Sequence, residues 1–236
     1  MKEDRYYELT DETIEFDGHT LHRIRCIKDF RYLKKGTLGG FVEGYENLYG
    51  DAWVGDEAKV YAGAVVRDRA VVGGVACVCN GAVVTEKALV NGKSLVSGSV
   101  TICGESILMN YATIVYSGQN LVKIKDSIIS GTTIIRGACF IEDTHLRGDA
   151  VIESDYDYIV FKNWWSSGRY FIWTRSNDMW SVGCFYGTGK ELIAKAYEDS
   201  KVSGREYERV VKYVEQIKRD SKPSLWRRVK KMLTGK

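Results

Sequence analysis

The sequence has little proline and no long apolar run. It holds one proline, Pro223, and 24 glycines among 236 residues, which fits repetitive β structure better than a disordered or collagen-like chain. No stretch of about 18 apolar residues is present, which excludes a membrane-spanning helix. The first residues lack the apolar core of a signal peptide. We therefore expect a cytoplasmic protein.

Cysteine and histidine are too scattered to frame a metal or catalytic site. Cys77 and Cys79 flank one residue and have no second close pair, so we expect reduced thiols, no metal and no cofactor. The three histidines are His19, His22 and His145. None has a partner at the spacing of a Ser-His-Asp or Cys-His arrangement. The sequence therefore assigns no catalytic residue.

Acidic residues are absent from the last sixteen positions, which carry six Lys and Arg residues. The other 220 residues hold 28 basic and 31 acidic residues, so they carry a net charge of −3 although the whole chain carries +3. Attraction to a polyanion must come from the tail, residues 221–236, or from a local cluster. Apolar residues alternate with the basic ones there, which suits an acidic partner, a membrane surface or a nucleic-acid backbone. We favour a solvated or partner-docked tail.

A six-residue repeat dominates residues 51–118. Small residues recur at Ala52, Ala58, Ala64, Ala70, Ala76, Ala82, Ala88, Ser94, Ser106 and Ala112, with Val100 in place of one. An aliphatic residue follows two positions after each, from Val54 to Ile114. Each triplet suits a short strand whose two marked side chains point inward. One such unit cannot bury its own apolar face, so neighbours must stack on it. The repeat predicts a β-helix, assigned to residues 44–153.

The repeat changes phase after Gly118. Triplets at 127–129, 133–135 and 139–141 stand three residues out of the earlier phase, and those at 144–146 and 150–152 fall one residue earlier again. We interpret residues 116–126 as an irregular coil or a loop extruded from the stack, which ends near Ile152.

The N-terminal residues 1–43 predict a hairpin and a cap for the stack. Asp17-Gly18 separates two strand-like segments, 6–16 and 19–27, and both turn residues of such a hairpin need positive φ. A solenoid requires a terminal unit that shields its open end.

Residues 24–30, 35–43 and 47–54 carry a family resemblance, which extends over roughly residues 5–115. These segments resemble the N-terminal module of phage and bacterial hexapeptide-repeat proteins, commonly catalogued as transferases or polymer-forming repeat proteins. The resemblance implies a single-stranded left-handed β-helix with eighteen residues per coil, and a phage or prophage setting. It implies little about activity, because one fold hosts many functions.

Coils of that size sort the outward residues onto three faces. The first face is apolar along four coils and carries Trp53, Val71, Leu89 and Ile107. An exposed apolar strip of this kind marks an interface, which a homo-oligomer or the folded-back C-terminal residues would cover. The alternative is that β-branched outward residues merely suit strands.

Residues 156–220 predict a small aromatic α+β module. Three strands, at 158–162, 169–175 and 179–185, form an antiparallel meander. One helix then follows Gly187 as far as Ser200, and a second begins at Ser203.

This module carries the candidate site for an anion or nucleotide. Backbone N–H groups at the helix start can hold an anion, while nearby aromatic and basic side chains can stack on a base and contact phosphates. The candidate residues are Lys162, Trp164, Trp165, Arg169, Trp173, Arg175, Gly187, Thr188, Gly189 and Lys190. The alternatives are a glycine turn with Thr188 as the helix cap, and aromatics that simply form the core of a small unit.

Three functions remain open at this point. The first is a non-enzymatic, oligomeric binding protein of phage type that captures an anionic small molecule, such as a nucleotide-like host defence signal, in an infected or lysogenic cell. The second is a host-protein inhibitor that acts through the β-helix face or the tail. The third is a hexapeptide-type acyltransferase, which the scarcity of histidine disfavours.

Overall fold

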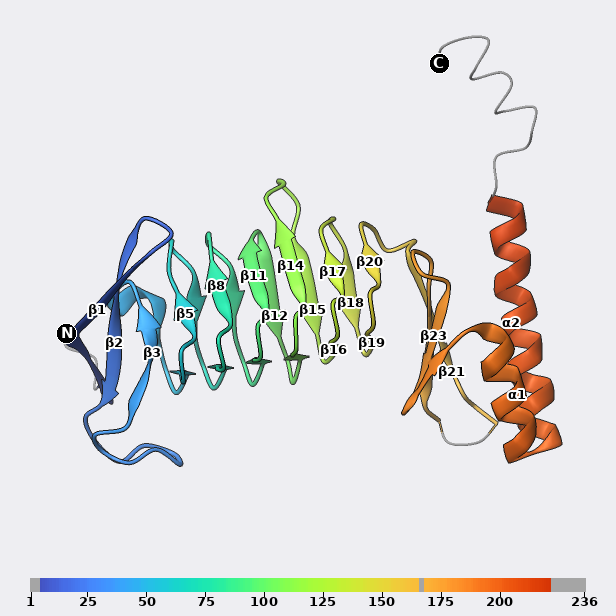
Figure 1. Ribbon diagram of the computed structural model, residues 1–236, viewed down its shortest axis with the longest axis horizontal. Coiled ribbons are helices and arrows are strands. Elements are labelled where there is room, and N and C mark those ends of the chain that lie inside the picture. Colours follow the sequence, from blue (N-terminus) through green and yellow to red (C-terminus); the bar gives the residue numbers. More distant parts are fainter. Residues whose placement is uncertain (1–4, 166–167, 222–236) are drawn as a thin grey trace, which may run out of the picture.

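The computed structural model describes residues 5–165 and 168–221 and shows a β-solenoid of about six turns, followed by an antiparallel sheet and two helices (Figure 1). Sheet 1 comprises β1 (Tyr7–Phe16), β2 (His19–Cys26), β3 (Leu38–Val42), β5 (Lys59–Val60), β8 (Cys77–Cys79), β11 (Leu95–Gly98), β14 (Thr113–Tyr116), β17 (Ile134–Ile135) and β20 (Val151–Ile152). Sheet 2 comprises β4 (Trp53–Val54), β7 (Val71–Val72), β10 (Leu89–Val90), β13 (Ile107–Leu108), β16 (Ile128–Ile129) and β19 (His145–Leu146). Sheet 3 comprises β6 (Val65–Val66), β9 (Val83–Val84), β12 (Val100–Cys103), β15 (Val122–Lys125) and β18 (Phe140–Glu142).

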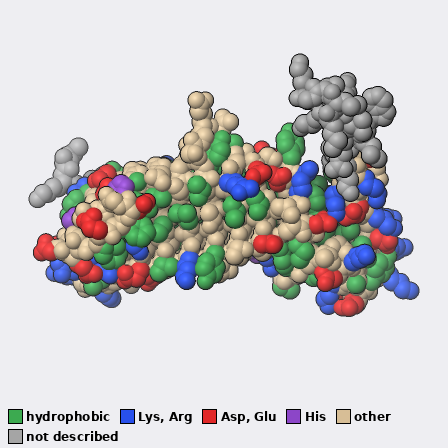
Figure 2. All heavy atoms as spheres, turned by 45° about the horizontal axis from the view of Figure 1, so that its top comes forward, with side chains coloured by type: hydrophobic (Ala, Val, Ile, Leu, Met, Phe, Trp, Pro, Cys, Tyr) green, Lys and Arg blue, Asp and Glu red, His purple; other side chains and the backbone are tan. Residues whose placement is uncertain are grey.

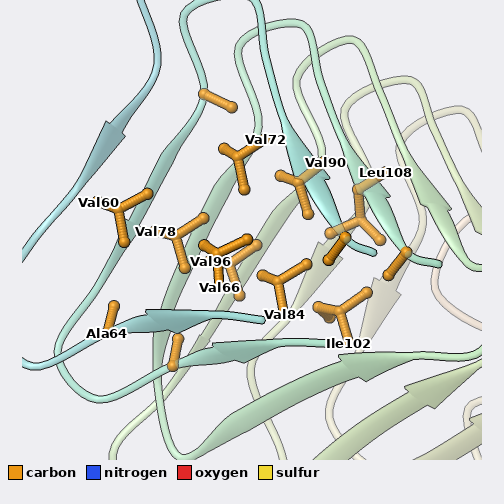
Figure 3. Close-up of a cluster of buried hydrophobic side chains, with 14 of the residues drawn as sticks. Val60, Ala64, Val66, Val72, Val78, Val84, Val90, Val96, Ile102 and Leu108 are labelled. Carbon is orange, nitrogen blue, oxygen red and sulfur yellow. The ribbon is translucent and has the colours of Figure 1, made fainter. Parts of the chain in front are cut away.

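The six-residue repeat builds the solenoid because each small-x-aliphatic triplet forms one strand. Parallel pairing joins Val54 to Val72, and Val72 to Val90, so one coil holds eighteen residues. The aliphatic members form stacked ladders in the interior, where Val60, Val78 and Val96 have no exposed surface (Figure 3). A core of Ala and Val leaves the coils narrow and lets adjacent backbones hydrogen-bond along their length.

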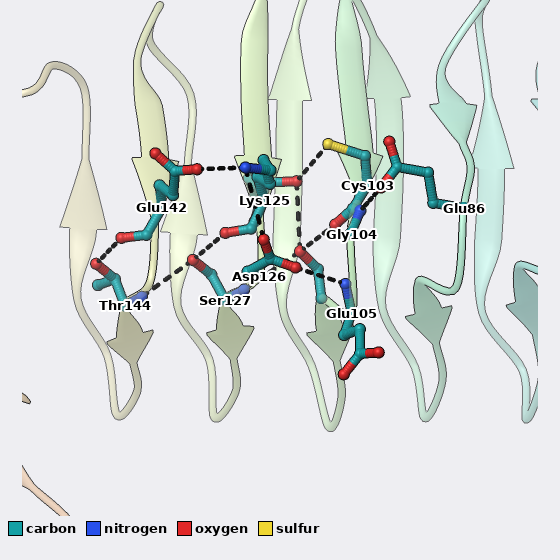
Figure 4. Close-up of polar contacts among 11 residues, drawn as sticks. Glu86, Cys103, Gly104, Glu105, Lys125, Asp126, Ser127, Glu142 and Thr144 are labelled. Atoms are coloured by element: carbon teal, nitrogen blue, oxygen red, sulfur yellow. Dashed lines mark hydrogen bonds and ion pairs between the residues drawn. The ribbon is translucent and has the colours of Figure 1, made fainter. Parts of the chain in front are cut away.

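The corners between strands repeat with the same period. The residue two positions before each small residue has a positive φ, as at Asp56, Asp68 and Asn110. Asp and Asn tolerate this left-handed conformation better than most residues, and glycine adopts it freely. Several acidic corner residues accept backbone N–H groups of an adjacent coil, and Asp126 accepts from Glu105 N at 2.8 Å (Figure 4). The polar residues between the triplets therefore bond the coils together.

One coil is longer than its neighbours. Ile107 pairs with Ile128, a step of 21 residues, and Ile128 pairs with His145, a step of 17. The extra residues lie between β14 and β15, where the chain projects from the stack (Figure 1). The phase changes in the sequence thus mark a projecting loop and one short coil.

The N-terminal hairpin continues sheet 1 beyond the first coil. β1 and β2 pair antiparallel around Asp17 and Gly18, whose φ angles are 53° and 79°, and β3 then pairs parallel with β5. The short helix η1 (Tyr45–Asn47) leads into the first coil. Tyr6 stacks on Phe30 with ring centroids 3.7 Å apart, and its ring also joins the solenoid core.

The C-terminal sheet has four strands, one more than the three predicted: β21 (Tyr158–Lys162), β22 (Tyr170–Thr174), β23 (Met179–Val182) and β24 (Phe185–Gly187). The prediction was wrong because Gly183 reverses the chain with a φ of 55°, which separates two strands that read as one segment. β22 is buried on both faces. Ile172 joins the solenoid core, whereas Phe171 and Trp173 join a separate core beneath the helices.

The last coil and the C-terminal sheet are joined by polar contacts. Arg147 donates from Nε to Ser181 Oγ at 2.8 Å and from its terminal nitrogen to Gly183 O at 2.9 Å and to the carbonyl of Phe185. Asn177 donates to Asp149 at 2.7 Å. The sheet is thus fixed between the end of the solenoid and the helices.

Two helices complete the described chain: α1 (Gly189–Asp199) and α2 (Lys201–Ser221). A Cβ at position 204 would lie 2.3 Å from the Tyr197 ring, so the glycine there permits the close packing of α1 on α2. Neither helix is long and apolar enough to cross a membrane, within the residues that the structure describes. The predicted basic tail falls almost wholly outside those residues.

Candidate ligand-binding cleft

A cleft of about 470 Å³ opens between one end of the C-terminal sheet and the two helices. Its volume lies within the range of small-molecule sites, roughly 300–1,000 Å³. Val182, Phe185 and Leu192 contribute apolar walls, and the polar lining residues are Asn163, Arg169, Cys184, Lys195, Asp199, Ser200, Ser203 and Tyr207. Charged side chains crowd this end of the molecule, whereas the visible face of the solenoid is mostly apolar or uncharged (Figure 2).

Two cations give the cleft its electrostatic character. Arg169 is held at the start of β22 because Asn163 N donates to Arg169 O at 2.8 Å. Its guanidinium makes no hydrogen bond or ion pair with any residue that the structure describes. Lys195 on α1 forms an exposed ion pair with Glu198 at 3.0 Å, which water screens strongly. Arg169 is therefore the cation available to an incoming anion.

The inner wall holds a buried amide. Asn163 is 3% exposed, and its Oδ1 atom has no hydrogen-bond partner among the residues that the structure describes. Its Nδ2 atom lies 3.5 Å from the hydroxyl of Tyr207. Burial raises the pKa of Tyr207, and this contact and the nearby Arg169 lower it in part. An unpaired buried amide oxygen costs about 1–3 kcal/mol, so a donor that reached it would be favoured.

Of the ten predicted ligand-binding residues, Arg169 alone is among the residues lining this cleft. Trp173 is 1% exposed in the core beneath the helices, and its Nε1 donates to Asp178 at 2.8 Å. That indole has no face open to a ligand. Trp165 packs edge-on against Phe171 and Tyr207. Trp164 is 80% exposed beside it.

The two remaining cations of the predicted site lie elsewhere. Lys162 is on β21, with its ammonium 5.8 Å from the ring centroid of Tyr170. Arg175 donates to Tyr156 O at 3.1 Å, next to the boundary between the solenoid and the sheet. Neither residue is among those that line the cleft.

The Gly187–Lys190 turn forms a helix cap. Thr188 accepts from Glu191 N, and the Glu191 carboxylate accepts in return from Thr188 N at 2.7 Å. The helix N-terminus thus already holds an anionic group of its own chain. A Cβ on Gly189 would lie 2.8 Å from Val211, so this glycine serves the packing of α1 on α2. The capping alternative accounts for this turn.

Sequence reasoning missed Asn163, Lys195 and Tyr207, which line the cleft. They lie 12 to 44 positions apart, in three different parts of the fold, and no spacing pattern links them. One signal was available: an asparagine that directly follows a strand, ahead of two tryptophans.

A second cavity of about 380 Å³ lies where sheet 2 meets the C-terminal sheet, and Arg169 lines it as well. His145 forms part of its wall, with Nε2 3.4 Å from Ser130 Oγ. Burial, and then the charge of Arg147, lower the pKa of His145. No ion pair joins this imidazole to a carboxylate among the described residues.

The predicted interface residues occupy one ladder of sheet 2. Trp53 pairs with Val71, Val71 with Leu89, and Leu89 with Ile107. Trp53 is only 4% exposed, because the N-terminal segment around Tyr6 and Gly39 covers it. The other three are half-buried, and Ile128 continues the ladder beyond them.

Within the described residues, no group of three or more His, Cys, Asp or Glu side chains is placed to hold a metal ion. A comparison with known protein families finds no family model that matches the chain, and no curated protein matches its sequence.

Proposed function

We propose that this protein is a non-enzymatic binding protein that captures a small anionic molecule in the cleft between the C-terminal sheet and the helices. The observation that carries the proposal is Arg169, a guanidinium held at the cleft wall without a partner among the described residues. Planar, bidentate donors of this kind suit carboxylate and phosphate oxygens.

The lining indicates the class of ligand. Phe185 and Leu192 offer apolar contact, while Ser200, Ser203 and Asn163 offer hydrogen-bonding groups. A molecule with an apolar or aromatic part and an anionic group, such as a nucleotide, matches this combination. Asp199 lines the same cleft and disfavours a densely charged polyanion, because its carboxylate would repel part of such a ligand.

The exposed thiol of Cys184 gives a direct measurement of occupancy, because it lies in the cleft wall. A panel of nucleoside mono- and diphosphates is screened for slower alkylation of Cys184 and for a rise in melting temperature. Arg169→Ala is expected to abolish both effects while the variant keeps its fold. Lys190→Ala is the matched control, since it removes a cation from the first turn of α1 outside the cleft. Equal loss in both variants, or an unprotected thiol with every nucleotide, contradicts the proposal.

The setting and the finer architecture belong to the same proposal. We propose a left-handed coil, an N-terminal hairpin that acts as a cap, and action in the cytoplasm of a phage-infected or lysogenic cell. Support for the cap comes from Tyr6, Ile24 and Cys26, which are buried against the first coil. Support for the setting is the resemblance of the N-terminal segments to phage repeat proteins.

A further inference from the structure

Sheet 2 carries an apolar strip along its outer surface. We define this strip as the half-buried side chains Val71, Leu89, Ile107 and Ile128, which stand in register on four successive coils. Successive coils lie about 4.8 Å apart, so the strip runs for roughly 14 Å. The loop that projects from the long coil lies between sheets 1 and 3, at the corner opposite sheet 2. It therefore leaves the strip open.

A row of charged residues flanks the strip on one side. Each member stands two positions before an outward residue of sheet 2, and all are exposed. In order along the solenoid, the charged row is Asp51, Arg69, Lys87, Glu105, Asp126 and Asp143. The opposite flank carries no charge along the same four coils, where it consists of Gly73-Gly74, Asn91-Gly92, Met109-Asn110 and Ser130-Gly131.

The charges in this row are segregated by sign. Arg69 and Lys87 line the cavity beside Val71 and Leu89, together with Arg31. Asp126 and Asp143 line the cavity beside Ile128. Asp51, at the basic end of the row, and Arg169, which comes from the C-terminal sheet near the acidic end, each offset part of the charge of their half. The strip thus has a basic half and an acidic half, which meet between Lys87 and Glu105.

This arrangement is complementary to itself in one orientation. A two-fold axis in the plane of the face and perpendicular to the solenoid reverses the direction of the second copy, yet keeps the charged row on the same side. Lys87 and Glu105 already pair at 2.7 Å within each chain, and the pairs of the two copies then meet at the axis. Arg69 of one copy faces Asp126 of the other, whereas the two acidic residues at the margins, Asp51 and Asp143, face each other. The parallel arrangement would place the row against the uncharged flank. Two-fold interfaces match one surface patch with itself, as this geometry requires.

We propose that the apolar strip and its charged row form the interface of an antiparallel homodimer of this chain. The ligand cleft lies between the far end of the C-terminal sheet and the helices, and Arg169 lines both this cleft and the cavity beside Ile128. The apolar side chains become buried at its centre, and the charged row selects the antiparallel register. Tyr32, which is 65% exposed beside Arg31, adds aromatic surface at each end.

A pair of charge reversals tests the proposal. Arg69 and Asp126 lie three coils, about 14 Å, apart in one chain and cannot contact each other there. In the antiparallel dimer they meet twice. Arg69→Glu and Asp126→Lys should each weaken self-association roughly tenfold or more, because both copies then present like charges. An equimolar mixture of the two variants should restore a heterodimer, in which each altered residue faces an opposite charge.

Sedimentation velocity at low ionic strength measures both results on the full chain, and melting temperatures report folding. Asp126 also accepts from Glu105 N, so Leu89→Asp serves as a second disrupting variant that leaves this corner intact. Val83→Asp is its matched control, since Val83 is the half-buried outward residue of the next ladder on sheet 3. Dimers of the wild type and of Val83→Asp, with association restored in the mixture, support the proposal. A monomeric or trimeric wild type, or a mixture that stays monomeric, overturns it.

Discussion

The solenoid and the C-terminal unit form their hydrophobic cores from different kinds of side chain. The solenoid buries many short side chains, each repeated eighteen residues later, as in the ladder Val54, Val72 and Val90. The C-terminal unit buries few but large ones, with Phe171, Trp173 and Trp180 at its centre. Stability is therefore spread evenly over the coils and concentrated in a few rings beyond them.

The largest effect is expected from removing one of those rings. Trp180→Ala should destabilise the C-terminal unit by about 3–5 kcal/mol, because the indole is fully buried and little can move in to fill the space. Urea unfolding followed by tryptophan fluorescence and far-ultraviolet circular dichroism measures it. The helical signal should be lost while the solenoid signal persists. Trp164→Ala, at an 80% exposed position, is the control and should change little. Simultaneous loss of both signals would contradict this prediction and show that the contacts of Ile172 and Arg147 make the two regions unfold together.

Overpacking should be the corresponding weakness of the solenoid. Ala82→Leu inserts a larger side chain into an interior with no exposed surface, at an expected cost of about 1–3 kcal/mol. Val83→Leu, the adjacent outward position, should cost much less. Denaturant midpoints of both variants give the comparison. Equal midpoints would show that the coil can widen freely.

The corners provide a smaller effect and a direct test of coil contacts. Gly92 and Gly63 have φ angles of 70° and 71°, so alanine is strained equally at both, by roughly 1–2 kcal/mol. A Cβ at Gly92 would also lie 2.7 Å from Asn110 N, whereas at Gly63 it meets nothing within 4 Å. Gly92→Ala should therefore melt below Gly63→Ala. The same melting temperature for both variants would show that the close approach of the added Cβ to Asn110 does not affect stability.

The smallest effect is a pH dependence at the boundary of the two regions. Burial lowers the pKa of His145 in the folded protein, so the unfolded chain binds the proton more tightly. Stability should therefore fall as pH drops below about 6.5, the usual pKa of histidine. Unfolding free energies measured between pH 7 and pH 5 should fall less steeply in His145→Gln. Identical slopes for the wild type and the variant would exclude His145 as the source.

The same contrast explains what could be predicted from sequence. The structure of the solenoid could be predicted because the position of a residue in the repeat fixes its position in the coil. The predicted stacking of Val71, Leu89 and Ile107 on one face is confirmed. The C-terminal unit has no period. An exposed Trp164 and a buried Trp173 therefore look alike, and only tertiary packing separates them.

The cleft shows the same limit. Arg169 was identifiable as a cation near a strand, but its neighbours Asn163 and Tyr207 come from a loop and a helix that meet only after folding. The Gly187–Gly189 turn could not be assigned from sequence for a related reason. Glycines at these positions are expected both in an anion-binding loop and where two helices pack closely. In the structure, the carboxylate of Glu191 occupies the position that an external anion would take.

The constant register of the coils makes the length of the molecule adjustable in whole units. Residues 65–82 form one complete turn, because Val65 pairs with Val83. Excising them would join Ala64 to Val83 and shorten the solenoid by about 4.8 Å, without altering the hairpin at one end or the Arg147 contacts at the other. The number of coils therefore sets the distance between the two ends of the solenoid. Deleting or duplicating whole coils would change that distance while each end keeps its own structure.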